Sequence, residues 1–219
     1  MSATVVAIDG PAGAGKSSVA GMLAKRLGFT HVNTGSLYRA VALAVRQAGR
    51  SVDHVEPDFL KTLRITFAGD RLLLNGEDPG EKLRSPACAA DASCVAKQPV
   101  VREFLLPVQR SIAASQWIVM EGRDIGTVIF PDAQVKIFLT ASPLVRAQRR
   151  MAQGEVPPGA TLEDVRREIE RRDLQDSTRA TAPLKAAPDA VTVDCSDMTL
   201  EETVSAIAAV VAEKRGKEA

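Results

Sequence analysis

The sequence contains few of the side chains from which metal centres and covalent catalysts are usually built. Its only cysteines are Cys88, Cys94 and Cys195, which show no CxxC spacing, and its only histidines are His31 and His54. Structural zinc sites and Cys/His nucleophilic catalysis need such residues grouped at ligand or catalytic spacing. We therefore expect neither in this protein.

The chain also lacks a strong bias in charge or hydropathy. Its formal net charge is +1 and its pI about 7.7, which give no electrostatic reason to expect nucleic acid or a membrane surface as a partner. No apolar run approaches the ~20 residues needed to span a bilayer, and no charged and apolar leader precedes the first predicted strand. These absences predict a cytosolic protein. The 219 residues suffice for one α/β core with appendages.

One short stretch carries the strongest signal in the sequence. Residues 10–17 read Gly-Pro-Ala-Gly-Ala-Gly-Lys-Ser and match the phosphate-loop pattern G-x-x-x-x-G-K-[ST] without a mismatch. An apolar, β-branched run at 4–8 predicts a buried strand before it, and helical spacing at 18–27 predicts a helix after it, closed by Gly28. A turn between a strand and a helix presents backbone N–H groups to phosphate oxygens, so we expect a nucleotide, ATP, to bind here.

Each residue of this loop has an expected role. Lys16 would neutralise the β- and γ-phosphates, and the Ser17 hydroxyl would ligate the Mg²⁺ that bridges them. Three glycines, Gly10, Gly13 and Gly15, are expected to leave room for the anion. The predicted ATP-binding residues are Gly10, Pro11, Ala12, Gly13, Ala14, Gly15, Lys16, Ser17 and Ser18.

The alternation of strand and helix is interrupted after the second predicted strand, at 29–33. Apolar runs at 63–67 and 72–74, separated by Gly69-Asp70, predict a small hairpin that does not belong in a doubly wound sheet. We therefore expect an inserted subdomain over residues 35–110, with helices near 86–97 and 99–114. Because Pro107 lies inside the second of these helices, a kink or an early break is expected there.

The parallel core is expected to comprise residues 1–34 and 111–219. Ser142-Pro143 predicts the start of a helix, the Pro-rich loop 152–160 a short lid, and Thr161 with Asp164 the start of a charged helix to about 173. The last helix is predicted to open with a capping box from Thr199 to Glu202 and to bury Leu200, Val204, Ile207, Ala208 and Val211. Further strands are predicted at 117–120, 134–139 and 190–194. This alternation of strands and helices predicts a five-stranded parallel sheet with helices on both faces and ligands at the carboxyl ends of its strands.

Three segments with arginines could hold a second, phosphorylated substrate. Thr34-Gly35 with Tyr38-Arg39 follows the second strand, residues 121–124 follow the third, and Arg172, Asp176 and Arg179 are expected to follow the charged helix. Within that helix the pairs 163/167, 166/170 and 168/172 are spaced for intrahelical ion pairs, so we expect those charges to form a solvated face. Arg146, Arg149 and Arg150 could simply stabilise the C-terminus of their predicted helix, although no acidic residue of that helix pairs with them. For Arg146 and Arg150 a functional role as lid arginines is an equally good interpretation.

The chain resembles the bacterial cytidylate kinases, small P-loop enzymes that transfer a phosphoryl group from ATP to CMP or dCMP. The resemblance rests on six blocks, at residues 8–17, 34–39, 121–133, 136–139, 146–150 and 172–184. It implies a three-layer P-loop kinase fold with an inserted, hairpin-bearing subdomain for the nucleoside monophosphate and a short lid. ATP with Mg²⁺ and CMP or dCMP are then the expected ligands, and we expect a monomer.

The resemblance also implies roles at matching positions. Ser93, Arg102 and Asp124 would face the cytosine, Arg123 and Arg179 the acceptor phosphate, and Arg172 and Asp176 the sugar. Thr34, Tyr38 and Arg39 complete the expected CMP site, and Lys16, Arg123, Arg179, Arg146 and Arg150 are the expected catalytic residues. The chain departs from the family pattern with Thr34 in place of Ser, with Glu121 in place of Asp, and with Pro107 interrupting a helix near Arg102. Its loop 152–160 also lacks a lysine that is often found there.

Two other functions remain open on the sequence. A P-loop kinase acting on UMP or on the hydroxyl of a small metabolite shares the phosphate loop, although a hydroxyl acceptor calls for a carboxylate base rather than three arginine sites. A nucleotide-dependent switch or binding module is the second. The N-K-x-D and D-x-x-G segments of GTPase switches are absent.

Overall fold

The chain divides into two units, each with its own apolar core. A computed structural model describes residues 5–68, 71–114, 116–154 and 156–216. One unit holds residues 32–116, and the other holds the described residues of 5–31 and 117–216. Thr4 of the first predicted strand, Gly69-Asp70 of the predicted hairpin turn, and residue 155 of the predicted lid lie outside the described residues.

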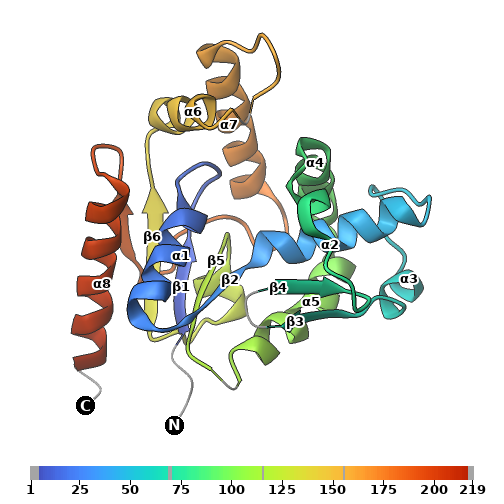
Figure 1. The fold of residues 1–219 in the computed structure, drawn as a ribbon, viewed down its shortest axis with the longest axis horizontal. Helices are drawn as coiled ribbons and strands as arrows, with labels where there is room; N and C mark the ends of the chain where they lie inside the picture. The colour runs from blue at the N-terminus through green and yellow to red at the C-terminus, as the bar shows by residue number, and fades with distance from the viewer. Residues whose placement is uncertain (1–4, 69–70, 115, 155, 217–219) are drawn as a thin grey trace. The chain divides into compact units, whose positions relative to one another are not determined.

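A five-stranded sheet forms the centre of the larger unit (Figure 1). Strand β1 pairs in parallel with β5 on one side and β6 on the other, and β6 pairs in parallel with β7. All residues of β1 and β5 are buried, as expected for central strands of a parallel sheet. The predicted sheet is confirmed, in the order β2-β5-β1-β6-β7. The strands are β1 Val5–Asp9, β2 Thr30–Asn33, β5 Ile118–Gly122, β6 Val135–Thr140 and β7 Val191–Asp194.

Helices α1 (Lys16–Leu27) and α8 (Leu200–Gly216) contact each other and the sheet through one apolar cluster. Helix α1 ends at Gly28, whose φ of +69° is the left-handed cap expected there. The capping box before α8 is confirmed, since Thr199 and Glu202 bond each other's backbone N–H groups. The prediction that Leu200 is buried is wrong: it is 43% exposed, because it precedes the stripe of α8 that packs inward.

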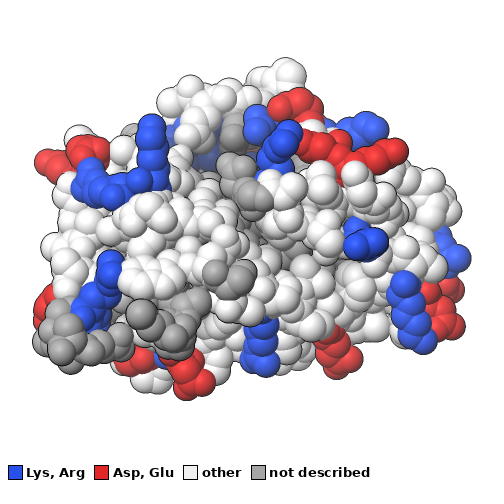
Figure 2. Space-filling model, turned by 60° about the horizontal axis from the view of Figure 1, so that its bottom comes forward, with Lys and Arg blue, Asp and Glu red and all other residues white. Residues whose placement is uncertain are grey.

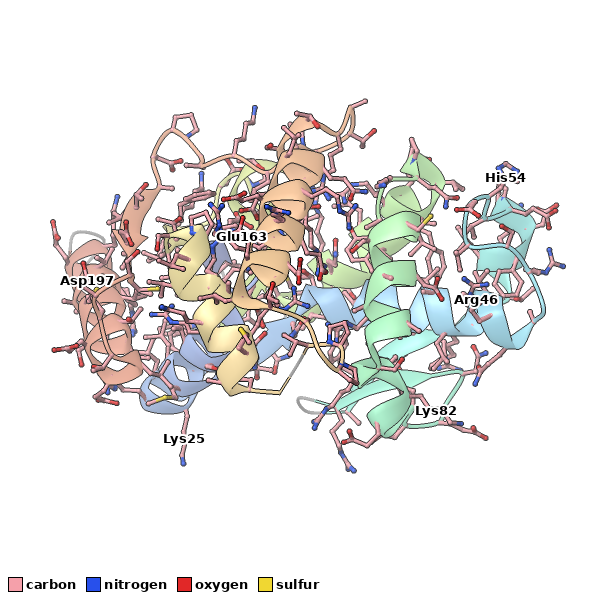
Figure 3. All side chains as sticks on the ribbon, turned by 90° about the horizontal axis from the view of Figure 1, so that it is seen from above. Lys25, Arg46, His54, Lys82, Glu163 and Asp197 are labelled. Atoms are coloured by element: carbon pink, nitrogen blue, oxygen red, sulfur yellow. The ribbon has the colours of Figure 1, made fainter. Side chains whose placement is uncertain are left out.

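Helices α6 (Pro143–Ala152) and α7 (Leu162–Thr178) pack together around Ala147, Val165 and Ile169. Ser142 caps α6, and the Thr161 capping box opens α7, as predicted. Figure 3 labels Glu163, which lies at the start of α7 and pairs with Arg166 and Arg167. The helix ends five residues later than the predicted position near 173, because the charged pattern continues without a glycine or proline to stop it.

Directly after β5 the chain forms a short π-helical turn, η2 (Ile125–Ile129), which the sequence did not predict. Its Phe130 N–H bonds the carbonyl of Ile125. Turns of this kind are rare and concentrate at functional sites.

The smaller unit contains the predicted hairpin, since β3 and β4 pair in antiparallel register. The segment beginning at Thr34 is helical from its first residue, because Asn33 accepts a bond from Ser36 N–H and caps the helix. Helix α5 runs through Pro107, so the predicted early break is wrong. Pro107 lies on the exposed side with Glu103, whose freed carbonyl can bind water. The elements are α2 Thr34–Gln47, α3 Pro57–Lys61, β3 Ile65–Ala68, β4 Arg71–Leu74, η1 Gly80–Arg84, α4 Pro86–Val95 and α5 Pro99–Ile112.

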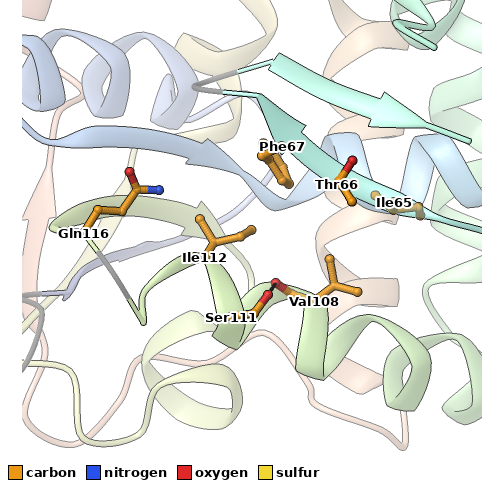
Figure 4. A pocket seen from close by; sticks show the side chains of 7 residues that line it. All are labelled: Ile65, Thr66, Phe67, Val108, Ser111, Ile112 and Gln116. Atoms are coloured by element: carbon orange, nitrogen blue, oxygen red, sulfur yellow. Dashed lines mark hydrogen bonds between the residues drawn. The ribbon is translucent and has the colours of Figure 1, made fainter. Parts of the chain in front are cut away.

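One apolar cluster unites the helices and the hairpin of this unit. At its surface Arg46 of α2, labelled in Figure 3, holds Asp91 of α4 with two bonds of 2.8 and 2.7 Å. A hollow of about 390 Å³ lies between β3 and α5 (Figure 4). Phe67, Ile112 and Gln116 line it, and none of its lining residues belongs to the predicted nucleotide sites.

Charge is mixed over the surface. On the face drawn in Figure 2, lysine and arginine side chains are scattered among uncharged ones, several of them beside acidic side chains. Among the described helices, none is both long and apolar enough to cross a membrane.

Candidate active site

The phosphate loop connects β1 to α1 in the larger unit. Gly15 caps α1 with a φ of +89°, a conformation that suits glycine. Lys16 is buried, and its Nζ donates a 2.7 Å hydrogen bond to the carbonyl of Pro11, so the lysine is held against its own loop. The helix N-terminus and this ammonium group make a site for an anion.

The three loop glycines serve different purposes. A Cβ on Gly10 would overlap the backbone carbonyl oxygen of Leu139 in β6, so this glycine lets the loop approach a strand. A Cβ on Gly13 would lie 3.4 Å from Cβ of Arg146. Only at Gly15 is the surrounding space open. The expectation that all three leave room for the anion is therefore corrected for Gly10, whose neighbour is backbone.

The buried Lys16 of the loop lies within electrostatic reach of Arg123. Burial lowers the pKa of Lys16 well below its usual value, and the nearby charge of Arg123 lowers it further. Glu121 and Asp9 oppose the effect, and Arg172 adds to it. Residues from the loop, from the end of β5 and from α7 thus lie within electrostatic reach of one another. An anion placed among them would relieve the repulsion between the cations.

The carboxylate of Glu121, at the end of β5, lies beside the hydroxyl of Ser17. Burial raises the pKa of Glu121, but hydrogen bonds with His31 and Ser17 and the charge of Lys16 outweigh it and hold the pKa below its usual value. The Nε2 of His31 lies 3.3 Å from Oε1 of Glu121. Gly21 of α1 lies next to this ring, and a Cβ there would be in ordinary van der Waals contact with its Nδ1, at 3.6 Å. Hydroxyl and carboxylate oxygens are the ligands that Mg²⁺ prefers, so the donor set fits a magnesium ion bound with ATP.

The predicted acceptor residues of this unit form two ion pairs. Arg123 Nε lies 3.0 Å from Oδ2 of Asp176, and Arg179 Nη2 lies 3.5 Å from Oδ1 of Asp124. Arg179 also donates a 2.6 Å bond to the carbonyl of Ala182. Because α7 is longer than predicted, Asp176 lies on the helix rather than after it, and Arg179 is its C-cap. Arg172 lies inside the helix, one residue before the predicted end near 173.

We next compared the chain with known proteins. The sequence pattern of the cytidylate kinases matches residues 6–213. The chain is 46% identical over 213 residues to a cytidylate kinase of Thermotoga maritima, with 95% of this chain and 97% of the relative covered. It is 44% identical over 225 residues to a cytidylate kinase of Rhodococcus opacus, with 98% and 97% covered. The chain belongs to the cytidylate kinase family.

A solved structure extends the comparison to the fold of this family member. A protein of uncharacterised function from Eubacterium ventriosum matches with a TM-score of 0.57 at 11% identity, covering 95% of this chain and 98% of that one. At this identity the likeness concerns the fold alone.

Arg146 and Arg150, the two predicted lid arginines, have acidic partners on α7. Arg146 is 3% exposed and donates three bonds, to the carbonyls of Ala141 (2.8 Å) and Ala12 (2.9 Å) and to Asp173 (2.6 Å). Arg150 lies 3.5 Å from Glu168. The sequence did not predict these pairs, since they join two helices. Arg146 thus ties the phosphate loop to α6 and α7.

The remaining predicted residues lie in the smaller unit. Thr34 is buried at the start of α2. The guanidinium of Arg102 on α5 lies 5.7 Å from the ring centre of Tyr38 on α2, so these two residues are brought together. Arg39 donates to the carbonyl of Leu83, and Ser93 to that of Ala89.

Sequence reasoning missed three residues of this neighbourhood: Asp9, His31 and Asp173. Asp9 accepts the backbone N–H groups of Ile125 and Gly126 at 2.7 and 2.8 Å. Burial raises its pKa to about 6, although the two hydrogen bonds lower it. A charged residue ending an otherwise apolar strand was the one available signal for Asp9. No signal existed for His31 or Asp173, whose partners lie far away in the sequence.

Proposed function

We propose that this chain transfers the γ-phosphoryl group of ATP to the phosphate of CMP or dCMP, giving CDP or dCDP. Membership of the cytidylate kinase family supports the reaction, and the names of the relatives support the acceptor. The single structural observation that carries the proposal is the phosphate loop itself, in which Gly15 has a φ of +89° and the buried Lys16 is held against the carbonyl of Pro11. The charge of Arg123, on the predicted acceptor segment, reaches this lysine and lowers its pKa. Phosphate groups bound near Lys16 and Arg123 would offset the repulsion between these two positive charges.

On the donor side, we assign the amides of residues 10–18 and the ammonium of Lys16 to the ATP phosphates. Ser17 would hold the Mg²⁺ that accompanies ATP, with Glu121 beside it. When bound, this ion would offset the negative charge of the ATP phosphate groups.

On the acceptor side, we assign Arg123 and Arg179 to the phosphate of CMP and Arg172 and Asp176 to its sugar. Asp124 would accept a hydrogen bond from the exocyclic amine of cytosine, for which a carboxylate is a suitable partner. No general base is required, since a phosphomonoester with a second pKa near ~6 already presents an anionic oxygen at neutral pH. Catalysis is then positioning and electrostatic stabilisation.

The residues of the smaller unit enter the proposal through the resemblance alone. Ser93 and Arg102 are assigned to cytosine, and Thr34, Tyr38 and Arg39 to the surroundings of the monophosphate. For Arg146 and Arg150, a direct role in catalysis stays a prediction. The bonds of Arg146 to Ala12 and Asp173 support a role in holding the phosphate loop.

A coupled assay that follows ADP formation tests the proposal. We expect turnover with CMP and dCMP and discrimination against UMP by up to about 10⁴-fold, because a site built to bind an amine rejects a base that lacks it. Activity only on a small alcohol, such as shikimate or a sugar acid, would support the alternative kinase and refute the proposal.

Lys16→Met separates a kinase from an idle binding module. We expect kcat to fall at least about 10²-fold, by analogy with the loss of one preorganised donor. Lys25→Met is the matched control, since Lys25 lies on the same helix with its side chain exposed (Figure 3). We also propose a cytosolic monomer, which sedimentation with and without both nucleotides can test.

A further inference from the structure

The side chain of Asp9 lies at the junction between the donor loop and the segment assigned to the acceptor. It is the last residue of β1, directly before Gly10, and is 4% exposed. Its two carboxylate oxygens each accept a backbone hydrogen bond from the segment after β5. They accept the N–H groups of Ile125 and Gly126 at the start of η2, at 2.7 and 2.8 Å.

The strand register connects Asp9 to the same segment, residues 122–126, a second time. In the parallel pair of β1 and β5, Asp9 lies opposite Gly122. The chain is therefore fixed to Asp9 at Gly122 through the sheet and again at Ile125 through the carboxylate. Only Arg123 and Asp124 lie between these two anchors. Their backbone path is set by one residue of β1.

The packing behind η2 limits how far this arrangement can relax. A Cβ on Gly126 would lie 3.2 Å from Cγ and Cδ of Lys136 and 3.4 Å from Oδ2 of Asp9, so a larger residue would require these side chains to shift by a few tenths of an ångström. Lys136 itself is held, since its Nζ bonds the carbonyl of Pro131 and lies 2.8 Å from Asp189.

The charges around Asp9 are consistent with a role beyond packing. A buried carboxylate is costly, and the pKa of Asp9 is accordingly raised by burial and by repulsion from Asp124, while Lys16 and the two amides favour the charged form. Asp9 thus interacts with the donor lysine on one side and with the acceptor aspartate on the other.

We propose that Asp9 is a positioning residue that sets Arg123 and Asp124 at a fixed place relative to the phosphate loop. Asp9 touches neither substrate. The inference rests on the proposed function, which assigns Arg123 to the acceptor phosphate and Asp124 to the base. Its consequence is selective: loss of the carboxylate disturbs CMP binding and base discrimination, while ATP continues to bind to a loop whose amides are intact.

The test is Asp9→Asn, in which one oxygen can still accept an N–H but the amide group cannot. We expect the KM and the calorimetric Kd for CMP to rise at least about 10-fold. Losses of this size are typical when a residue that orients the ligands of a metal ion is replaced, and Asp9 would orient Arg123 and Asp124 in a comparable way. The ratio of kcat/KM for CMP over UMP should fall, and the Kd for ATP should stay within about 3-fold. Asp194→Asn is the matched control, because Asp194 also ends a strand and accepts a backbone N–H, from Ser196, but is exposed. It should change none of these quantities.

Gly126→Ala perturbs the same contact from the other side and serves if the first variant does not fold. We expect the same selective loss of CMP affinity, and a double variant that loses less than the sum of the two effects. Equal losses of ATP and CMP affinity, or unchanged CMP binding in both single variants, would overturn the inference. Failure of the unaltered protein to phosphorylate CMP would instead refute the proposed function.

Discussion

Arg146 provides a sharp test of how much one buried side chain stabilises the phosphate loop. The substitution Arg146→Met keeps most of the volume and removes three hydrogen bonds, to the carbonyls of Ala12 and Ala141 and to Asp173. Breaking a buried pair by removing one partner costs about 3–5 kcal/mol, because the other charge stays buried. The side chain of Asp173 is 24% exposed, so water recovers part of this cost and we expect about 3 kcal/mol.

The loss can be measured by urea unfolding and by melting. For a chain of this size 1 kcal/mol shifts Tm by about 2–4 °C, so a fall of about 6–12 °C is expected. Arg166→Met is the control. Arg166 has more ionic contacts than Arg146, with Glu163 and Glu170, but they lie at the surface and are screened by solvent. If the two variants melted alike, burial would not be what gives the Arg146 contacts their strength, and the reasoning would be refuted.

Three further predictions concern other residues of the site. The folded-state pKa of Asp9 is raised, so its contribution to stability is present at low pH and is lost as pH rises through about 6. The unfolding free energy of the unaltered protein minus that of Asp9→Asn should therefore grow by about 1.4 kcal/mol from pH 7.5 to pH 5, and a flat or opposite slope in urea titrations would contradict this. His31→Leu removes a hydrogen-bond partner of Glu121 and should raise the Mg²⁺ concentration for half-maximal activity about 10-fold, whereas His31→Gln should restore it; equal behaviour of the two would count against a role for the bond. Gly10→Ala should destabilise by about 4 kcal/mol or more, because the new Cβ meets backbone, while Gly28→Ala, at a φ that is also positive (+69°) but in open space, should cost about 1 kcal/mol in the same denaturation assay.

Local patterns in the sequence predicted most of the elements that carry the site. Several elements depend only on neighbours within a few residues: the phosphate-loop pattern between strand and helix, the hairpin, and the capping boxes at Thr161 and Thr199. The errors also have local causes. Helix α7 lacks a stop signal, Leu200 precedes the buried stripe of α8, and α5 accommodates Pro107 on its exposed side.

What the sequence could not predict are contacts between residues far apart in the chain. The bonds from Ile125 and Gly126 to Asp9 span more than 100 positions, and Arg146 reaches Ala12 across 134. No periodicity relates such residues, so only the folded sheet brings them together. The turn η2 was missed for a related reason, since its shape depends on a carboxylate that belongs to a different strand.

Arg123 and Arg179, which we assign to the acceptor phosphate, each form an ion pair, and under that proposal the pairs bear on how substrate binds and product leaves. Arg123 lies against Asp176 and Arg179 against Asp124. An arriving phosphate would therefore exchange places with carboxylates that already neutralise these guanidinium groups, and would not meet bare charge. The same carboxylates can pair with the arginines again when the diphosphate product dissociates. Arginines that are already paired with carboxylates bind the substrate phosphate less tightly, and they also release the product faster. Fast release suits an enzyme whose product must dissociate after every cycle.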